Sequence, residues 1–145
     1  MNGGRRHSTR LVAVLLPSLL ALALPLADAA GADVAGKVIG HGVRLKGTNV
    51  WFADGKAVGP KTMSAHVTPV PAQTVKVQWA VVCQKPNKSD PSFHLAAKGT
   101  SGTTSLQKAG TVKLRLPYPK PHTCVATVYA TLGTSGRLTL RLLQT

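Results

Sequence analysis

Few side chains in this sequence could carry out acid–base chemistry. After residue 29 the only acidic residues are Asp33, Asp54 and Asp90, and no glutamate occurs anywhere in the chain. Hydrolases that work with paired carboxylates need two acids brought close together. Asp54 precedes a glycine and Asp90 precedes a proline, which are ordinary turn positions. The sequence therefore predicts that the protein is not an enzyme of this type.

Metal-binding, nucleophilic and phosphate-binding motifs are also missing from the sequence. No G-x-S-x-G motif marks a serine nucleophile, and no glycine-rich motif marks a bound nucleotide. The histidines after residue 29 stand singly, without the paired spacing of a metal site; they are His41, His66, His94 and His122. We therefore predict no catalytic residue, no cofactor and no metal ion.

The strongest chemical prediction concerns the two cysteines, Cys83 and Cys124. In an exported chain two cysteines most simply form one disulfide, and the strand alternation places both on an inward face. Closing a loop of about 40 residues adds about 4 kcal/mol to the free energy of unfolding in the chain-entropy model. The alternatives are two free buried thiols, or a cysteine nucleophile activated by His122.

The disulfide also brings two loops to the same end of the domain. Cys83 closes its strand and Cys124 opens its own, so the strands overlap only when they run antiparallel. The loop after Cys83 then lies beside the proline-rich segment 117–122, and loops on a rigid scaffold commonly carry binding sites. The candidate binding rim consists of Lys85, Asn87, Lys88, Tyr118, Lys120 and His122. Two ordinary surface turns are the alternative.

The elements that must position these residues are strands rather than helices. Apolar and polar residues alternate through 74–83, 111–117, 124–132 and 136–145, and glycine-containing turns separate the runs. These features predict an all-β fold: a single antiparallel β-sandwich, immunoglobulin-like, with seven to eight short strands and one disulfide. A small β-barrel is the alternative.

The N-terminal region divides the chain into an export signal and a domain. Three arginines within the first ten residues precede an apolar run at 11–26, and small residues follow. This order is typical of a secretory signal peptide, and no later segment is apolar enough to span a membrane. We therefore predict a signal peptide at 1–29, a flexible lead-in at 30–42 with room for a short strand, and the β-sandwich domain at 43–145.

The chain is strongly basic. After residue 29 it carries 15 lysines and arginines against three acidic residues, a net charge of +12. Such a charge attracts polyanions, including nucleic acid and phosphate-rich wall polymers. Several cations flank apolar strand residues, as Arg44 and Lys46 flank Leu45, which predicts that they lie on outer strand faces. The alternative is that the charge only keeps an exported domain soluble.

One resemblance to known proteins rests on two strand motifs. The sequence VQWAVVC at 77–83 is followed by HTCVATVYATLGTSGRLTLRLLQT at 122–145. This combination resembles a group of small exported actinobacterial β-sandwich proteins of unassigned function, loosely immunoglobulin-like. The resemblance covers residues 62–145 and implies export and a single domain, but it supplies no site residues.

Together these patterns predict a secreted, extracellular and monomeric binding module, associated with the cell surface or cell wall. Its expected partners are anionic wall polymers or extracellular nucleic acid. An aromatic platform at Trp51 or Tyr129 could stack a sugar or a base, or the ring could simply cover the sheet edge. The alternative function is a protein-interaction factor, an inhibitor or toxin-like protein, that presents its proline-rich loops at the disulfide.

Overall fold

The described part of the chain is built from strands joined by turns. The computed structural model describes residues 35–86 and 97–145. The predicted signal peptide, the first part of the lead-in, and the rim residues Asn87 and Lys88 lie outside these ranges.

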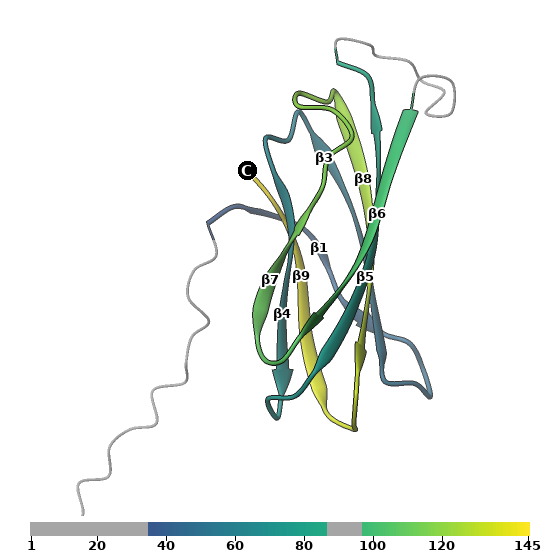
Figure 1. The fold of residues 1–145 in the computed structure, drawn as a ribbon, viewed down its shortest axis with the longest axis vertical. Helices are drawn as coiled ribbons and strands as arrows, with labels where there is room; N and C mark the ends of the chain where they lie inside the picture. The colour runs from purple at the N-terminus through teal and green to yellow at the C-terminus, as the bar shows by residue number, and fades with distance from the viewer. Residues whose placement is uncertain (1–34, 87–96) are drawn as a thin grey trace, which may run out of the picture. The chain divides into compact units, whose positions relative to one another are not determined.

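Nine strands lie in the described residues (Figure 1). They are β1 (Lys37–His41), β2 (Val43–Arg44), β3 (Val50–Val58), β4 (Met63–Val70), β5 (Val75–Gln84), β6 (Ala97–Leu106), β7 (Gly110–Leu114), β8 (Thr123–Leu132) and β9 (Arg137–Gln144). The sequence predicts seven to eight strands. The count is higher because the lead-in supplies β1, and because Val43 and Arg44 form the separate two-residue strand β2.

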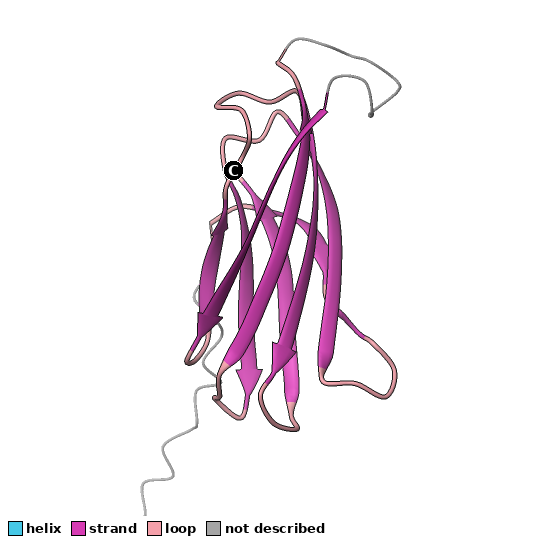
Figure 2. Cartoon of the chain, turned by 45° about the vertical axis from the view of Figure 1, so that its right-hand side comes forward, coloured by secondary structure: helices cyan, strands magenta, loops and turns pink. Residues whose placement is uncertain are grey.

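The strands form two antiparallel sheets that pack as a sandwich (Figure 2). The four-stranded sheet has the order β1-β9-β4-β7, and the five-stranded sheet has the order β2-β3-β8-β5-β6. β8 pairs with β3 on one side and with β5 on the other, so it forms the centre of the larger sheet. The predicted β-sandwich with one disulfide is therefore confirmed, and the barrel alternative is not.

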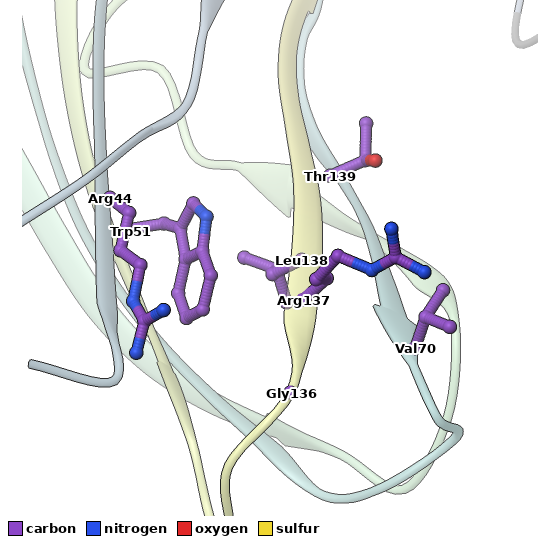
Figure 3. Close-up of a pocket in the computed structure, with 7 residues that line it drawn as sticks. All are labelled: Arg44, Trp51, Val70, Gly136, Arg137, Leu138 and Thr139. Atoms are coloured by element: carbon purple, nitrogen blue, oxygen red, sulfur yellow. The ribbon is translucent and has the colours of Figure 1, made fainter.

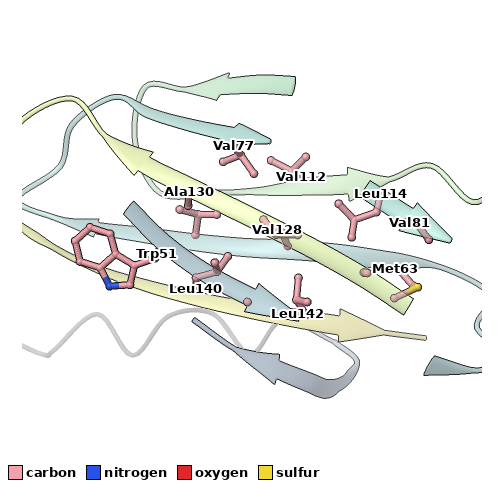
Figure 4. Close-up of a cluster of buried hydrophobic side chains, with 14 of the residues drawn as sticks. Trp51, Met63, Val77, Val81, Val112, Leu114, Val128, Ala130, Leu140 and Leu142 are labelled. Atoms are coloured by element: carbon pink, nitrogen blue, oxygen red, sulfur yellow. The ribbon is translucent and has the colours of Figure 1, made fainter. Parts of the chain in front are cut away.

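The core consists of the apolar residues that alternate along each strand (Figure 4). In β5, Val75, Val77, Val81 and Cys83 are fully buried, while the residues between them reach the surface. Successive side chains of a strand point to opposite faces, so one face of each sheet is apolar and the two faces pack together. Trp79 shares the inward face of β5 but is only partly buried, since it lies beside the edge strand β6.

Residues 37–41, which the sequence places in a flexible lead-in, form a paired strand. β1 pairs with β9 and faces β3 of the other sheet. A Cβ atom on Gly40 would overlap the carbonyl oxygen of Asp54, and one on Gly55 would lie 2.8 Å from the carbonyl oxygen of Ile39. The glycines therefore allow the two backbones to approach closely, and a glycine-rich sequence forms a strand for that reason.

Candidate functional site

The disulfide joins β5 to β8 at one end of the sandwich. Cys83 and Cys124 face each other in the antiparallel ladder, and their sulfur atoms are 2.05 Å apart. Both side chains are fully buried. At the same end, Val58 in the last position of β3 pairs with Thr123 in the first position of β8. In the other sheet, Met63 at the start of β4 pairs with Gln144 at the end of β9. We call the end where these strands meet the disulfide end.

Backbone hydrogen bonds hold three segments together at the disulfide end. The His122 N–H donates to the Gln84 carbonyl oxygen over 3.4 Å, and the His122 carbonyl oxygen accepts from the Gly59 N–H over 2.7 Å. The segment 117–122 is therefore tied to the end of β5 on one side and to the β3–β4 turn on the other. The β3–β4 turn is a third contributor that the sequence does not reveal.

The structure places the predicted rim residues in different environments. Lys85 and Lys120 are exposed, whereas His122 is partly buried. Tyr118 is also partly buried and packs against the core. Asn87 and Lys88 lie outside the described residues. The role of these residues in binding stays a prediction.

Two adjoining clefts open at the disulfide end. The first has a volume of 430 Å³ and lies between the β3–β4 turn and residues 119–122. The second has a volume of 410 Å³ and lies between residues 61–62 and residues 113–119. Lys61 and Pro119 line both clefts, so the two clefts share a wall.

Four cations line these clefts, and we call them the rim cations: Lys61, Lys113, Arg115 and Lys120. No acidic residue is among the described residues that line either cleft. The sequence predicts Lys120 as part of the rim but not Lys61, Lys113 or Arg115. The pairing of β7 with β4 brings Lys113 and Arg115 beside Lys61. That pairing joins segments distant in sequence, and no local pattern records it.

A further cleft, with a volume of 460 Å³, lies at the opposite end of the sandwich (Figure 3). β3 and β9 begin at this far end, and β4 ends there. Both sheets contribute to the walls. The lining residues of this Arg44 cleft are Arg44, Trp51, Val70, Gly136, Arg137, Leu138 and Thr139.

Arg44 is held in a defined orientation in this cleft. Its Nε donates to the Thr48 carbonyl oxygen over 2.8 Å, and its Nη2 donates to Asn49 Oδ1 over 3.2 Å. The guanidinium carbon lies 5.2 Å from the centroid of the Trp51 ring, within the range of a cation–π interaction. The ring itself is only 5% exposed. Trp51 therefore supports the arginine from the edge of the core.

The position of Arg44 corrects the expectation that it lies on an outer strand face. Arg44 lies opposite Trp51 in the β2–β3 ladder, and Trp51 faces the core. Residues directly opposite each other share a face, so Arg44 is on the inner side and Val43 is on the outer side. β2 is a two-residue edge strand. A charged side chain on its inner side can therefore still reach water.

Of the two residues predicted as an aromatic platform, only Tyr129 has an exposed ring. Trp51 is buried, whereas Tyr129 is 42% exposed on the outer face of the five-stranded sheet. The Tyr129 ring lies beside Phe52, with centroids 5.2 Å apart and planes inclined by 50°. A shallow pocket of 350 Å³ next to Tyr129 includes Gln78 and Thr127. Cross-strand packing explains the ring pair without a ligand, and the platform stays a prediction.

Within residues 35–86 and 97–145 the structure shows neither a cluster of metal ligands nor a long apolar helix. No three histidine, cysteine, aspartate or glutamate side chains there could hold a metal ion together. No helix in those ranges is long and apolar enough to cross a membrane.

Comparison with known proteins gives little further information. No protein-family model matches the chain, and no curated protein matches it. One solved structure is described as "Structural basis for the promiscuous specificity of the carbohydrate-binding modules from the beta-sandwich super family". It shares 15% sequence identity over 65% of this chain, with a TM-score of 0.35. The chain spans 41% of that protein's length, and a similarity this low does not bear on function.

Proposed function

We propose that this chain is an exported, non-enzymatic binding module whose disulfide end binds anionic polymers. The observation that carries the proposal is the set of rim cations, which line two adjoining clefts without an acidic residue among the described lining residues. Phosphate or carboxylate groups are attracted to such a surface, and the neighbouring protein charge does not oppose them.

The shape of the disulfide end favours a polymer over a small isolated anion. Lys61 and Pro119 belong to both clefts, so successive charged units of one chain can occupy the two clefts together. The rim cations come from a turn, a strand and the segment 117–122. Contacts spread in this way add up along a repeating ligand, and each contact can be weak.

The rigidity of the segment 117–122 supports the same proposal. Its prolines fix the backbone dihedral φ at three positions, and the hydrogen bonds of His122 fix its end. A loop that is already ordered loses little entropy when it binds. Export is proposed from the signal-like residues 1–29 and from the disulfide, which persists in oxidising compartments.

The proposal is tested by binding of the purified chain to isolated cell walls and to duplex DNA over a series of salt concentrations. The variant Lys61→Ala/Lys120→Ala removes one cation shared by the clefts and one from the first cleft. Affinity should fall about tenfold or more. On DNA, the slope of log affinity against log salt should fall by about 0.9 for each phosphate contact that is lost.

A matched control is Lys46→Ala/Lys76→Ala, which removes two exposed cations that line neither cleft. If the control loses as much affinity as the rim variant, binding reflects net charge alone and the proposed site is wrong. Retention on walls but not on DNA at physiological salt would assign the ligand to wall polymers, and the reverse would assign it to nucleic acid.

A second candidate function is a protein-interaction factor that presents the segment 117–122. The observation in its favour is that Pro119 and Lys120 are exposed while His122 is anchored on both sides. A partner bound mainly through apolar contacts would depend little on salt, unlike a polyanion. The salt series above therefore separates the two functions, because a salt-independent partner would favour this one.

A further inference from the structure

Arg44 has unused hydrogen-bond donors in the cleft at the far end. A guanidinium group carries five N–H donors. The Nε–H donates to the Thr48 carbonyl oxygen, and one Nη2–H donates to Asn49 Oδ1. Within the described residues this side chain makes no other hydrogen bond. The rest can bind an anion, and guanidinium groups hold carboxylate or phosphate oxygens through paired N–H groups.

The charge of this cleft is uniformly positive. Arg137 lines it from β9, on the other side of Trp51 and Leu138 from Arg44 (Figure 3). No acidic residue is among its described lining residues. An anionic group on Arg44 would therefore meet no opposing charge, while Arg137, which lies opposite the exposed Val70 on the outer face of β9, adds attraction from farther away.

The edge of β9 adds backbone groups to the same cleft. The Gly42 N–H donates to the Leu140 carbonyl oxygen over 2.7 Å, so the backbone groups of Leu140 point toward β1. Backbone groups of alternate strand residues point to the same side, and Leu138 therefore does the same. β1 ends at His41, opposite Arg141, so no β1 residue lies opposite Leu138. Its N–H and C=O therefore have no partner in β1, and Leu138 lines the cleft.

The aromatic ring in this cleft does not offer a stacking face. Trp51 is 5% exposed, and Arg44 lies over it. A nucleobase, which binds single-stranded sites largely by stacking, would find no free ring face here. Recognition in this cleft rests on charge and on hydrogen bonds to hydroxyl groups. A hydroxylated ring that carries one anionic group fits that description.

We propose that the Arg44 cleft binds one anionic sugar unit, with a carboxylate or a phosphate on Arg44 and ring hydroxyls on the backbone of Leu138. The volume of 460 Å³ falls in the range of small-ligand sites. This site shares no residue with the clefts at the disulfide end. It therefore stands independently of the proposed polymer-binding function.

The test is a titration of the isotope-labelled full chain, followed by NMR, with glucuronate, glucose 6-phosphate and glucose. Resonances of the Trp51 indole N–H and the Leu138 amide should shift and saturate with at least one anionic sugar, and not with glucose. A response to glucuronate alone assigns a carboxylate, a response to glucose 6-phosphate alone assigns a phosphate, and responses to both assign an anion of either kind. Each of these results supports the proposal.

Variants identify the residue responsible. Arg44→Ala should weaken the binding about tenfold or more, because charge-assisted hydrogen bonds are lost. The control Lys46→Ala removes a neighbouring exposed cation outside the cleft and should leave the affinity unchanged. Arg44→Lys keeps the charge but not the planar fork and should also bind weakly. It serves as the folded comparison if Arg44→Ala unfolds.

Three results would overturn the proposal: no saturable shift with either anionic sugar, equal shifts with glucose, or equal losses in Arg44→Ala and Lys46→Ala. The rim variant Lys61→Ala/Lys120→Ala should titrate with the sugars like the unmodified chain. A failure at the Arg44 cleft is thereby distinguished from a failure of the polymer-binding function, which the rim variant tests separately.

Discussion

The two ends of the sandwich both carry positive charge, but they hold it differently. At the disulfide end no side-chain hydrogen bond of the rim cations occurs within the described residues, and these side chains project from three separate segments. At the far end Arg44 makes two side-chain hydrogen bonds and lies against Trp51. At the disulfide end the covalent bond fixes the backbone but not the charged side chains. At the far end hydrogen bonds and the Trp51 ring fix the guanidinium group of Arg44 itself.

This difference suggests two kinds of recognition. Lysine side chains have many rotamers, so the rim cations can follow a polymer whose charges repeat without a unique register. A guanidinium fixed by hydrogen bonds favours one anionic group in one geometry, because little further entropy is lost on binding.

The largest expected effect follows from removing the disulfide. The bond spans 41 residues, and the variant Cys83→Ala/Cys124→Ala should lose about 4 kcal/mol in free energy of unfolding. For a domain of this size the melting temperature should fall by about 15–25 °C, which thermal unfolding measures. Amide hydrogen exchange should rise more at Gly59 and His122 than at Leu132, whose N–H donates to the Asn49 carbonyl oxygen at the far end. Equal increases at both ends would contradict the comparison.

A smaller effect is expected in the edge strand between the two ends. A Cβ atom at Gly102 would lie 2.6 Å from the ring of Trp79, so Gly102→Ala should cost about 1–3 kcal/mol through overpacking. The control Gly99→Ala lies in the same strand, and its Cβ would meet its nearest neighbour at 3.6 Å. Chemical denaturation should show a loss for the first variant only. Below its melting temperature that variant should still bind ligands at both ends.

The contribution of Arg44 to stability is expected to be smaller again. Arg44→Ala loses the contact with Trp51 and two hydrogen bonds, all near the surface, and should cost about 1 kcal/mol in urea denaturation. Lys46→Ala, which removes an exposed neighbour, should stay within about 0.5 kcal/mol of the unmodified chain. Equal effects would mean that Arg44 is not fixed, and the contrast between the ends would fail.

Much of the fold could be predicted from the sequence because one face of each sheet is buried. Because side chains of a strand alternate between its two faces, a buried face appears in the sequence as apolar residues at every second position. Val75, Val77 and Val81 in β5 are an example. The same alternation placed both cysteines in the core. A short strand was expected in the lead-in, but its pairing with β9 was not, because Gly40 and Gly55 act by lacking side chains and that requirement depends on how closely the two sheets pack.

The candidate sites were harder to predict than the fold. Lys120 follows from the disulfide, because a covalent bond fixes which loops are neighbours, whereas Lys85, predicted on the same ground, is not among the residues that line the two clefts. Lys61 and Arg115 reach the same end only through the pairing of β4 with β7, which leaves no local trace in the sequence. Arg44 was placed on the wrong face because a two-residue edge strand has too few residues for alternation to reveal its orientation.

The smallest expected effect is a dependence of stability on pH that arises in the middle of β4, away from both ends. His66 Nδ1 lies 3.1 Å from Thr111 Oγ1, and its Nε2 lies 3.4 Å from Thr68 Oγ1. Partial burial, and then the positive charge of Arg141, lower the pKa of His66 below its ordinary value of 6.5. The unfolded chain therefore binds more protons than the folded chain between the lowered pKa and 6.5.

The stability contributed by neutral His66 is thus fully present above pH 6.5 and decreases as the pH falls through that window. His66→Gln keeps a hydrogen-bonding side chain but cannot be protonated there. Its melting temperature should fall less between pH 7.5 and pH 5 than that of the unmodified chain. Equal decreases would exclude His66 as the source. Because His66 lines neither the clefts at the disulfide end nor the Arg44 cleft, the variant should bind at both ends as the unmodified chain does.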